Sequence, residues 1–523
     1  MVGLFVLGSL AACGGNPPQI VDYFPERGAK DVSTAAPIRI TFDHAVDKGS
    51  VESRLSLQPT TPTTVNWVSP KQLLLQHSTL QTNTTYDVVL EAGYTDLSGN
   101  AYSLRHHWSF ITELAPSLSD AAPGNEEGGV DPATFLTLDF SREMNPASLP
   151  GAITITPAAP FNVRLDPTDG RRAIVAPQSL LSPSTEYTVT VSSSALDTDG
   201  NQLDRDRTLT FTTGPARPLR HWIGFATRRL DGTLNGVWIV NENGFPRQLF
   251  AEQAINSFSW SPDGTKLLVQ TGPQAWAALT PGADSVRLGF SGVWAAALSP
   301  AFGYVYLDPH SELHRWSADG VDDVIATGVS SATVAPGGLR VAYVRSQGST
   351  SAIWGYDVGL HASYLLASEE APITYASWSP AANRIAYLRQ DAGALTLRVR
   401  SLTGQATTST IVSGDLGHPA WLPDSTHVVF ASVIQSPTGP LRKAFLVSIV
   451  APSPALTVDV ALPTGSTLDI SDPVPSPDGH QIAFLSGDQV WIMNADGTRP
   501  TRLTKFDASA FPYSCEAPMW TRA

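Results

Sequence analysis

Apolar and polar residues alternate in short runs along most of the chain. In the segments TYDVVL, which begins at Thr85, and EYTVTV, which begins at Glu186, every second side chain is aromatic or aliphatic. A period of two places alternate side chains on opposite faces of a β-strand. Turn signals rich in Gly, Pro, Asn and Asp separate these runs. The pattern therefore predicts an all-β chain of short strands joined by tight turns.

The first half of the chain contains one unit twice. The segments IRITFDHAVD and LTLDFSREMN, near the start of each unit, match each other. Their offset differs slightly from the 101 positions that separate the later landmarks, which places the length change in the loops between. A register kept over several landmarks predicts two copies of one antiparallel sandwich of about 100 residues. Four landmarks recur 101 positions apart: Tyr86 with Tyr187, Asp96 with Asp197, Asn100 with Asn201, and Phe110 with Phe211.

The motifs of the two copies resemble a known family. FDHAVD, DLSGN and WSFIT, with their counterparts in the second copy, are similar to bacterial Ig-like domains of the SbsA type. The resemblance covers roughly residues 18–214, with domains at 21–113 and 114–214, and it implies modules that act as spacers. We interpret DLSGN and DTDGN as turns, because calcium needs six to eight oxygen ligands and one such loop offers too few.

A second repeat begins at about residue 219. Each unit is a strand that ends in proline, followed by a turn and an apolar strand such as KLLVQ or RIAYL. The spacings of 38, 36, 44, 43 and 54 residues are typical of four-stranded propeller blades. One blade cannot bury both of its faces, so neighbouring blades stack around a ring. The repeated prolines are Pro262, Pro300, Pro336, Pro380, Pro423 and Pro477.

The two ends of this region complete each other. The opening HWIGFAT matches the second strand of a repeat and lacks a first, whereas the closing EAPMWTRA places Trp520 at a first-strand position. We therefore predict a β-propeller over residues 219–523, closed by pairing its N- and C-terminal strands. The prediction is seven blades. Six or eight stay open, because the 54-residue interval holds a Pro-rich insertion at Ala451–Ala455.

Tryptophan and the last repeat add detail to this prediction. Eleven of the 13 Trp residues lie in this half, and we interpret Trp260, Trp378 and Trp421 as packing between blades, with carbohydrate stacking as the alternative. PSPDGHQIAFLSGDQVWIMNADGTRPTRLT resembles the TolB-type propeller repeat over nearly its whole length. This resemblance implies the fold. Such repeats serve translocation components, protease gating domains and lectin-like modules alike.

The N-terminus has the features of an export signal. VGLFVLGSLAAC is an apolar stretch that ends in small residues and is too short to span a bilayer. Its end resembles the lipobox of bacterial lipoproteins, which implies residues 1–13 as signal segment, a lipid on Cys13 and a tether at 14–20. The first basic residue is Arg27, which departs from the pattern, and a buried strand with a chance cysteine is the alternative. Cys515 is then a lone thiol and is expected to be a small buried hydrophobe.

Net charge and the absence of known motifs limit the ligands and reactions that the sequence predicts. The net charge is −14, with 33 Lys and Arg against 47 Asp and Glu, which argues against nucleic-acid binding. The sequence has no Gly-x-Ser-x-Gly elbow, phosphate-binding loop, Cys-x-x-Cys or His-Glu-x-x-His, so we predict no catalytic residue, metal ligand or cofactor. Three pairs are expected to lie on the surface or in polar segments between strands: His106 with His107, Asp322 with Asp323, and Glu369 with Glu370.

These features together predict a lipid-anchored, extracytoplasmic binding or scaffold protein. Two Ig-like spacers would hold the propeller away from the membrane, and its ligand would be a protein, a peptide or a glycan. One alternative is a component of an envelope complex similar to TolB. The other is a lyase or glycosidase that uses the propeller funnel, which requires acid–base groups that converge at one mouth.

Overall fold

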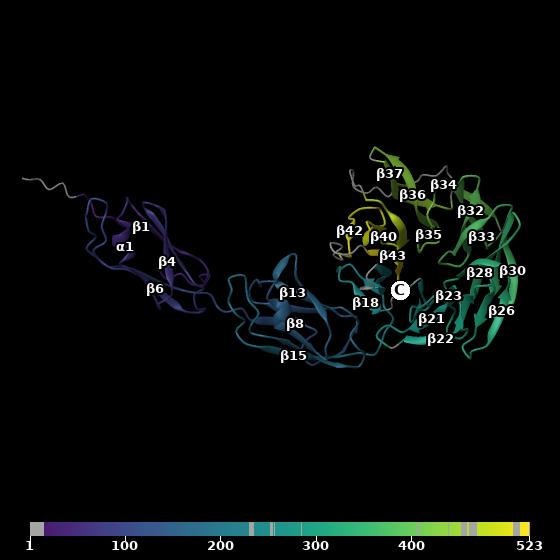
Figure 1. Ribbon diagram of the computed structural model, residues 1–523, viewed down its shortest axis with the longest axis horizontal. Helices are drawn as coiled ribbons and strands as arrows, with labels where there is room; N and C mark the ends of the chain where they lie inside the picture. The colour runs from purple at the N-terminus through teal and green to yellow at the C-terminus, as the bar shows by residue number, and fades with distance from the viewer. Residues whose placement is uncertain are drawn as a thin grey trace, which may run out of the picture.

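The chain folds almost entirely into β-strands, as predicted. The computed structural model describes residues 15–229, 235–251, 255, 257–283, 285–404, 407–437, 439–450, 458–459, 468–505 and 513–521. Figure 1 shows two small sandwiches followed by a ring of sheets. Two short helices occur in this part of the chain, α1 (Lys48–Glu52) and α2 (Leu149–Ala152). None of its helices has the length and apolar character needed to cross a bilayer.

The first sandwich packs a four-stranded sheet against a three-stranded one. Alternation decides which side chains enter its core: in β2, Ile38, Ile40 and Phe42 are buried, and the residues between them are half-exposed. Trp108, from the opposite sheet, joins the same core. The sheets are β1 (Ile20–Phe24), β2 (Ile38–Phe42), β5 (Gln72–His77) and β4 (Thr63–Ser69), then β3 (Leu55–Gln58), β6 (Thr85–Leu90) and β7 (His106–Ile111).

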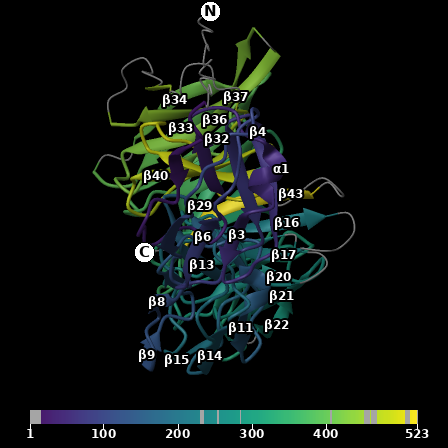
Figure 2. The same cartoon turned by 90° about the vertical axis from the view of Figure 1, so that its left-hand side faces the viewer.

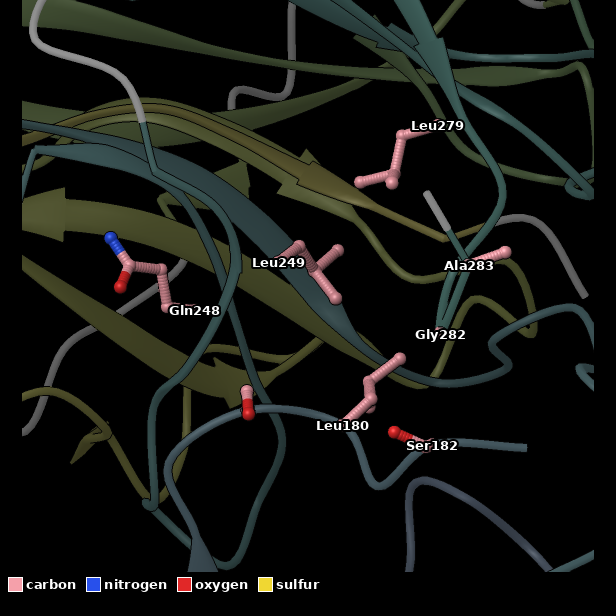
Figure 3. A pocket seen from close by; sticks show the side chains of 8 residues that line it. Leu180, Ser182, Gln248, Leu249, Leu279, Gly282 and Ala283 are labelled. Carbon is pink, nitrogen blue, oxygen red and sulfur yellow. The ribbon is translucent and has the colours of Figure 1, made fainter. Parts of the chain in front are cut away.

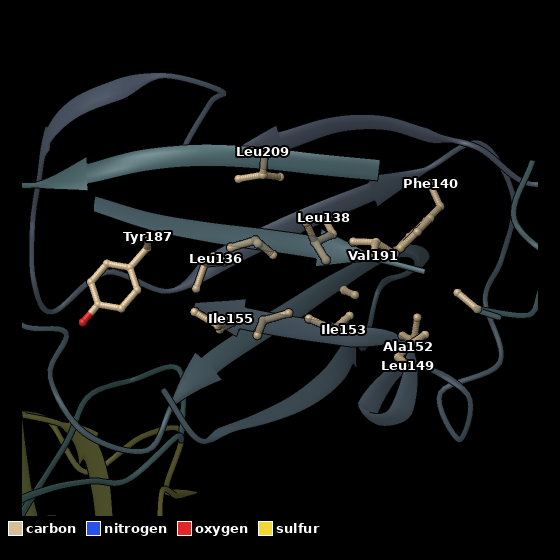
Figure 4. Packing of buried hydrophobic residues seen from close by; sticks show 14 of the residues in the cluster. Leu136, Leu138, Phe140, Leu149, Ala152, Ile153, Ile155, Tyr187, Val191 and Leu209 are labelled. Carbon is tan, nitrogen blue, oxygen red and sulfur yellow. The ribbon is translucent and has the colours of Figure 1, made fainter. Parts of the chain in front are cut away.

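The second sandwich has two four-stranded sheets. Figure 4 shows Leu136, Leu138 and Ile155 among the side chains that fill the space between them. One edge strand, β9, pairs in parallel with β15. The sheets are β12 (Phe161–Asp166), β13 (Asp169–Pro177), β10 (Leu136–Phe140) and β8 (Leu118–Ala122), then β11 (Ile153–Thr156), β14 (Glu186–Val191), β15 (Arg207–Thr213) and β9 (Glu127–Val130).

The sequence landmarks occupy equivalent places in the two sandwiches. Tyr86 lies opposite Phe110 across β6 and β7, and Tyr187 lies opposite Phe211 across β14 and β15, with both ring pairs stacked. Each tyrosine hydroxyl accepts a backbone N–H five residues upstream. Asp96 caps its own turn, because its carboxylate accepts two backbone N–H groups. The predicted repeat and its turns are confirmed.

A buried polar cluster joins the two sandwiches. Glu113, at the end of the first, accepts hydrogen bonds from the Thr34 backbone N–H at 3.1 Å and from Asn201 Nδ2 at 2.8 Å. Arg142 of the second sandwich pairs with the same carboxylate. Thr34 Oγ1 also donates to Asn201 Oδ1 at 2.7 Å. Because a buried carboxylate without partners is costly, this cluster favours one orientation between the domains.

Seven four-stranded antiparallel sheets, which we call blades, follow the sandwiches in the described residues. Their strands, from the centre outward, are β19 (Phe258–Trp260), β20 (Leu267–Gln270), β21 (Ala275–Leu279), β22 (Ser285–Ser291); β23 (Trp294–Ala297), β24 (Tyr304–Leu307), β25 (Leu313–Trp316), β26 (Asp322–Ala326); β27 (Val329–Val334), β28 (Arg340–Gln347), β29 (Thr350–Asp357), β30 (Ala362–Glu369); β31 (Ile373–Trp378), β32 (Arg384–Asp391), β33 (Ala394–Ser401), β34 (Thr408–Gly414); β35 (Ala420–Trp421), β36 (His427–Ser436), β37 (Gly439–Ser448), β38 (Val458–Asp459); β39 (Ser471–Pro475), β40 (Gln481–Ser486), β41 (Gln489–Asn494), β42 (Thr501–Arg502); and β43 (Tyr513–Trp520), β16 (Ile223–Arg229), β17 (Gly236–Val240), β18 (Arg247–Phe250). In Figure 1 the first strands β23 and β35 lie nearer the centre of the ring than the fourth strands β26 and β30.

The last strand closes the ring, as predicted. β43 pairs antiparallel with β16, with Ile223 opposite Trp520, and the two lie side by side in Figure 2. Beyond the strand, the Thr521 backbone N–H donates to the Trp222 carbonyl at 2.7 Å, and Thr521 Oγ1 accepts from the Trp222 N–H at 3.0 Å. The blade that begins the propeller therefore takes its inner strand from the end of the chain.

Buried apolar clusters fill every junction between neighbouring blades. Phe225 of β16 and Val490 of β41 share one cluster, which joins the last blade to the first. The predicted role of the tryptophans is confirmed: Trp378 packs with residues of β28 and β29, and Trp421 with residues of β32 and β33. The ring thus buries both faces of each blade by stacking alone.

The Ser-Pro-Asp-Gly sequence forms the turn between the first and second strands of a blade. Ser261 is buried, and its Oγ donates to Asp263 Oδ1 while it accepts the Lys266 backbone N–H at 2.9 Å. Gly264 adopts a φ of 71°, which glycine tolerates best. Ser476 makes the same pair of bonds in the last blade. Six turns join the first and second strands of a blade in this way, and we call them the proline turns: those with Pro262, Pro300, Pro336, Pro380, Pro423 and Pro477.

The second sandwich is docked against the propeller. Arg247 of β18 is fully buried and donates to the Thr134 carbonyl at 2.6 Å. Its guanidinium lies 4.2 Å from the ring centre of Phe135, which in turn stacks on Trp222. Burial lowers the pKa of Arg247 to about 9. Aromatic faces therefore replace a carboxylate as the partner of this cation.

Candidate functional site

A pocket lies where the inner strands of the blades converge. It has a volume of about 580 Å³, and six of the seven blades contribute to it. The proline turns supply much of its wall, because each one follows directly on an inner strand. We call it the axial pocket. Its lining is Pro262, Pro336, Tyr375, Ser377, Trp378, Pro380, Pro419, Ala420, Trp421, Pro423, Val474, Pro475, Ser476, Pro477, Met519 and Trp520.

The axial pocket is uncharged. None of the described residues that line it is Asp, Glu, Lys, Arg or His. Its one titratable group is the Tyr375 hydroxyl, whose pKa is raised by burial, so it stays protonated at neutral pH. An apolar wall with scattered hydroxyl and carbonyl groups binds uncharged ligands and offers no acid–base pair.

The sequence shows these prolines but not their common role. Each was predicted to end a strand before a turn, and the structure adds that equivalent turns from several blades line one pocket. The missing signal was the ring itself: if each proline follows an inner strand, all of them face one mouth of the channel. Pro300 is the exception, since it is exposed and does not line the pocket.

A smaller hollow lies at the junction between the second sandwich and the propeller. It has a volume of about 390 Å³, and Figure 3 shows Leu180 and Ser182 on the sandwich side, facing Leu249 and Leu279 of the propeller. Next to it, the Gln248 backbone N–H donates to the Gln178 carbonyl at 2.8 Å. This hollow is a gap beside a docked interface, with no ionisable side chain among its described residues.

The structure tests the prediction for one of the two cysteines. Cys13, the predicted lipid-attachment residue, lies outside the described residues, so its lipidation stays a prediction. Cys515 is buried in β43, and its sulfur lies 3.9 Å from Thr504 Oγ1. Burial raises the pKa of its thiol to about 12, which keeps it protonated and unreactive. The expectation of a buried hydrophobe is confirmed.

The histidine pair is only partly as expected. His106 and His107 point to opposite faces of β7, as predicted, and His107 is exposed. His106, however, is half-buried and packs edge-on against Tyr23 and Trp108. The expectation that both are surface residues was wrong for His106, because an aromatic pair covers it.

The expectation for the carboxylate pairs was also wrong in part. Asp322 and Asp323 lie within β26, and Glu369 ends β30, so three of the four are strand residues. Glu369 is only 8% exposed and pairs with Arg398 at 2.6 Å and Arg389 at 3.2 Å. Polar composition suggested loops, but two arginines of the next blade pair with this carboxylate across the junction between blades.

Glu369 and its neighbour give a matched test of this ion-pair cluster. Glu369→Gln leaves the buried side of Arg398 without its carboxylate partner, while Arg389 keeps its pair with Asp391 at 2.8 Å. We expect the substitution to lower the free energy of unfolding by about 1–3 kcal/mol. Glu370→Gln should change it little, because Glu370 is exposed. Urea unfolding of both variants checks the prediction. Equal effects of the two substitutions would refute it.

Comparison with known proteins identifies the family of the two sandwiches. Residues 15–112 and 113–213 each match the family model described as a bacterial Ig-like domain. The predicted pair of Ig-like domains is therefore confirmed. A search of curated proteins found no match.

Solved structures with some similarity to this chain include three from bacteria. TolB from Acinetobacter baumannii is 14% identical, with a TM-score of 0.38 and coverage of 71% of this chain and 83% of that one. Oligogalacturonate lyase from Vibrio parahaemolyticus is 11% identical, with a TM-score of 0.36 and coverage of 55% and 87%. Hydrazine synthase from Kuenenia stuttgartiensis is 13% identical, with a TM-score of 0.37 and coverage of 46% and 76%. The propeller assignment itself rests on sheet order and the packing between blades.

Proposed function

We propose that this chain is an extracytoplasmic binding protein whose axial pocket takes an uncharged, apolar peptide segment of a protein partner. The observation that carries the proposal is the lining of this pocket: prolines and tryptophan edges from six blades, with no charged side chain among its described residues. Extended peptides rich in proline and aliphatic residues dock on such surfaces through apolar contacts and a few backbone hydrogen bonds. The envelope-complex alternative is one form of this proposal.

A peptide fits this lining better than a sugar or an enzyme substrate. Carbohydrate stacking needs an open aromatic face, whereas Trp378, Trp421 and Trp520 are only 6–8% exposed and pack between blades. Bond cleavage by a lyase or glycosidase typically needs a pair of acid–base groups, and the described lining offers a single tyrosine hydroxyl, that of Tyr375. Binding of an apolar segment requires only the surface that is present.

The two Ig-like domains serve, in this proposal, as spacers between the propeller and a membrane. Their junctions favour this role: the Glu113 cluster orients the first domain on the second, and Arg247 fixes the second on the propeller. A lipid on Cys13 would supply the anchor. Mass spectrometry of the native protein tests this point, since an unmodified N-terminus that includes Met1 would remove the anchor from the proposal.

Peptide binding in the axial pocket can be tested by adding one charged side chain to its wall. Selection from a random peptide display library on the full chain should enrich uncharged sequences rich in Pro, Leu or Trp. Pro423→Arg places a cation at the pocket wall, at an exposed position that should tolerate it, and we expect at least a ten-fold loss of affinity for the selected peptides.

Pro300→Arg is the control for this test. It introduces the same charge at the equivalent proline turn outside the pocket, so affinity should stay unchanged. Enrichment of charged peptides, or equal loss in both variants, would contradict the proposed site. Capture of a stoichiometric partner from native envelopes that competes with the selected peptides would support it.

A further inference from the structure

Three potential metal ligands lie together at the turn between β24 and β25. One carboxylate oxygen each from Asp308 and Glu312 and a ring nitrogen of His314 lie within 4.8 Å of one another. All three residues are half-buried or buried. We call them the turn cluster. Spacing of this kind is close to what a single ion requires, and small side-chain rotations bring such atoms into coordination distance.

His314 is the feature that points to a ligand. It is 9% exposed, and its Nε2 has no hydrogen-bond partner among the described residues, although Glu312 Oε2 lies 3.8 Å away. A buried ring nitrogen without a partner is costly. Nε2 therefore lies near the Glu312 carboxylate without a hydrogen-bond partner, which is an arrangement that a cation between them would complete.

The opposite side of the imidazole is fixed by a second layer of contacts. His314 Nδ1 lies 3.1 Å from Asp322 Oδ1, and the Tyr306 hydroxyl donates to Asp322 Oδ2 at 2.7 Å. The Tyr306 ring also stacks on His314, with 4.7 Å between ring centres. A carboxylate that accepts the Nδ1 proton holds histidine in the tautomer whose Nε2 binds metal, as seen around known metal-ligating histidines.

The turn itself positions the carboxylates. Asp308 Oδ1 accepts the backbone N–H groups of His310 at 2.9 Å and Glu312 at 2.7 Å, which orients the carboxylate toward the turn. The His310 ring, which is largely exposed, lies 3.0 Å from Asp308 Oδ2. A fourth potential ligand, and a second nitrogen donor, is therefore adjacent to the cluster.

We propose that the turn cluster binds a divalent transition-metal ion of the zinc type, through Asp308, Glu312 and Nε2 of His314. Two carboxylates and one neutral imidazole match the oxygen and nitrogen preference of such ions, and their charge of −2 neutralises the cation. Partial exposure of Glu312 leaves room for water in a further position.

This site is separate from the axial pocket. The proline turns join first and second strands, whereas the turn cluster joins the second and third strands, which places it on the opposite face of the ring. The Val329 backbone N–H, at the start of the next blade, donates to the Ser311 carbonyl at 2.9 Å. A bound ion would therefore stabilise the turn at the junction of two blades, and this inference does not depend on the peptide proposal.

Titration of the chelator-treated full chain with Zn²⁺ alone tests the site. Calorimetry should give one site per chain, and Co²⁺ in its place should give visible ligand-field absorption. Glu312→Gln and Asp308→Asn should each weaken binding at least ten-fold, and Asp322→Asn roughly ten-fold through loss of histidine orientation. Circular dichroism confirms that the variants are folded.

Asp323→Asn is the matched control. Asp323 neighbours Asp322 but pairs with Arg315 at 3.5 Å, so its substitution should leave the affinity unchanged. Absence of stoichiometric binding would overturn the proposal. So would a Zn²⁺ affinity that Glu312→Gln and Asp308→Asn leave intact, since the ion would then sit elsewhere.

Discussion

A chain that ends at Lys505 is expected to lose at least about 5 kcal/mol of propeller stability, on the order of the whole stability of a domain. The truncation removes β43 and leaves β16 as an open inner edge. It also strips Cys515 and Trp520 from the cluster that joins the last blade to the first. Both apolar burial and a full ladder of backbone hydrogen bonds are lost. Urea unfolding followed by tryptophan fluorescence measures the effect.

A chain that ends at Thr521 is the control for this truncation. It keeps β43 and the paired hydrogen bonds between Thr521 and Trp222, so it should unfold like the intact protein. If the chain ending at Lys505 melted no lower than this control, the ring would not depend on its last strand.

Gly338→Ala should strongly destabilise the propeller through one of the proline turns. Gly338 has a φ of 67°, and an added Cβ would lie 2.3 Å from the backbone nitrogen of Ser299 in the preceding blade. Left-handed strain and a backbone clash together should cost about 2–4 kcal/mol. The clash involves main-chain atoms of two blades, so no side-chain rotation relieves it. Differential scanning calorimetry should show the propeller transition shifted downward.

Gly337→Ala separates this effect from the general loss of a glycine. Gly337 lies next to Gly338, and its added Cβ would meet nothing within 4 Å. Its φ is not in the left-handed region. We expect a change within about 0.5 kcal/mol, as for an ordinary surface substitution. Comparable destabilisation by both variants would argue against close packing of the proline turns.

Repeats made most of the fold predictable from the sequence. The separation of Tyr86 from Tyr187 identified two equivalent sandwiches, and the pairing of each tyrosine with its phenylalanine confirms the register. Trp520 identified the closing strand, because it stands at a first-strand position, and its pairing with Ile223 confirms the closure. Both inferences used local patterns that recur, and recurrence makes a weak local signal reliable.

Long-range partners were not predictable in the same way. Glu369 can be buried because Arg389 and Arg398, from other strands, pair with its carboxylate. No local sequence pattern indicates that pairing. The Glu113 cluster likewise depends on Asn201, which is distant in sequence. The axial pocket was missed for a related reason: it belongs to no single repeat and exists only once the blades form a ring.

Cys515 gives the most direct measurement of ring closure. With Cys13 replaced by alanine, its thiol is the one cysteine in the chain, and it is buried in β43 with a pKa of about 12. Labelling therefore requires β43 to detach. If the last strand is an integral part of the ring, the opening free energy from labelling rates equals the global unfolding free energy and falls with urea at the same slope. Labelling that is several kcal/mol easier than global unfolding and insensitive to urea would show that the strand frays on its own, which contradicts the closed ring.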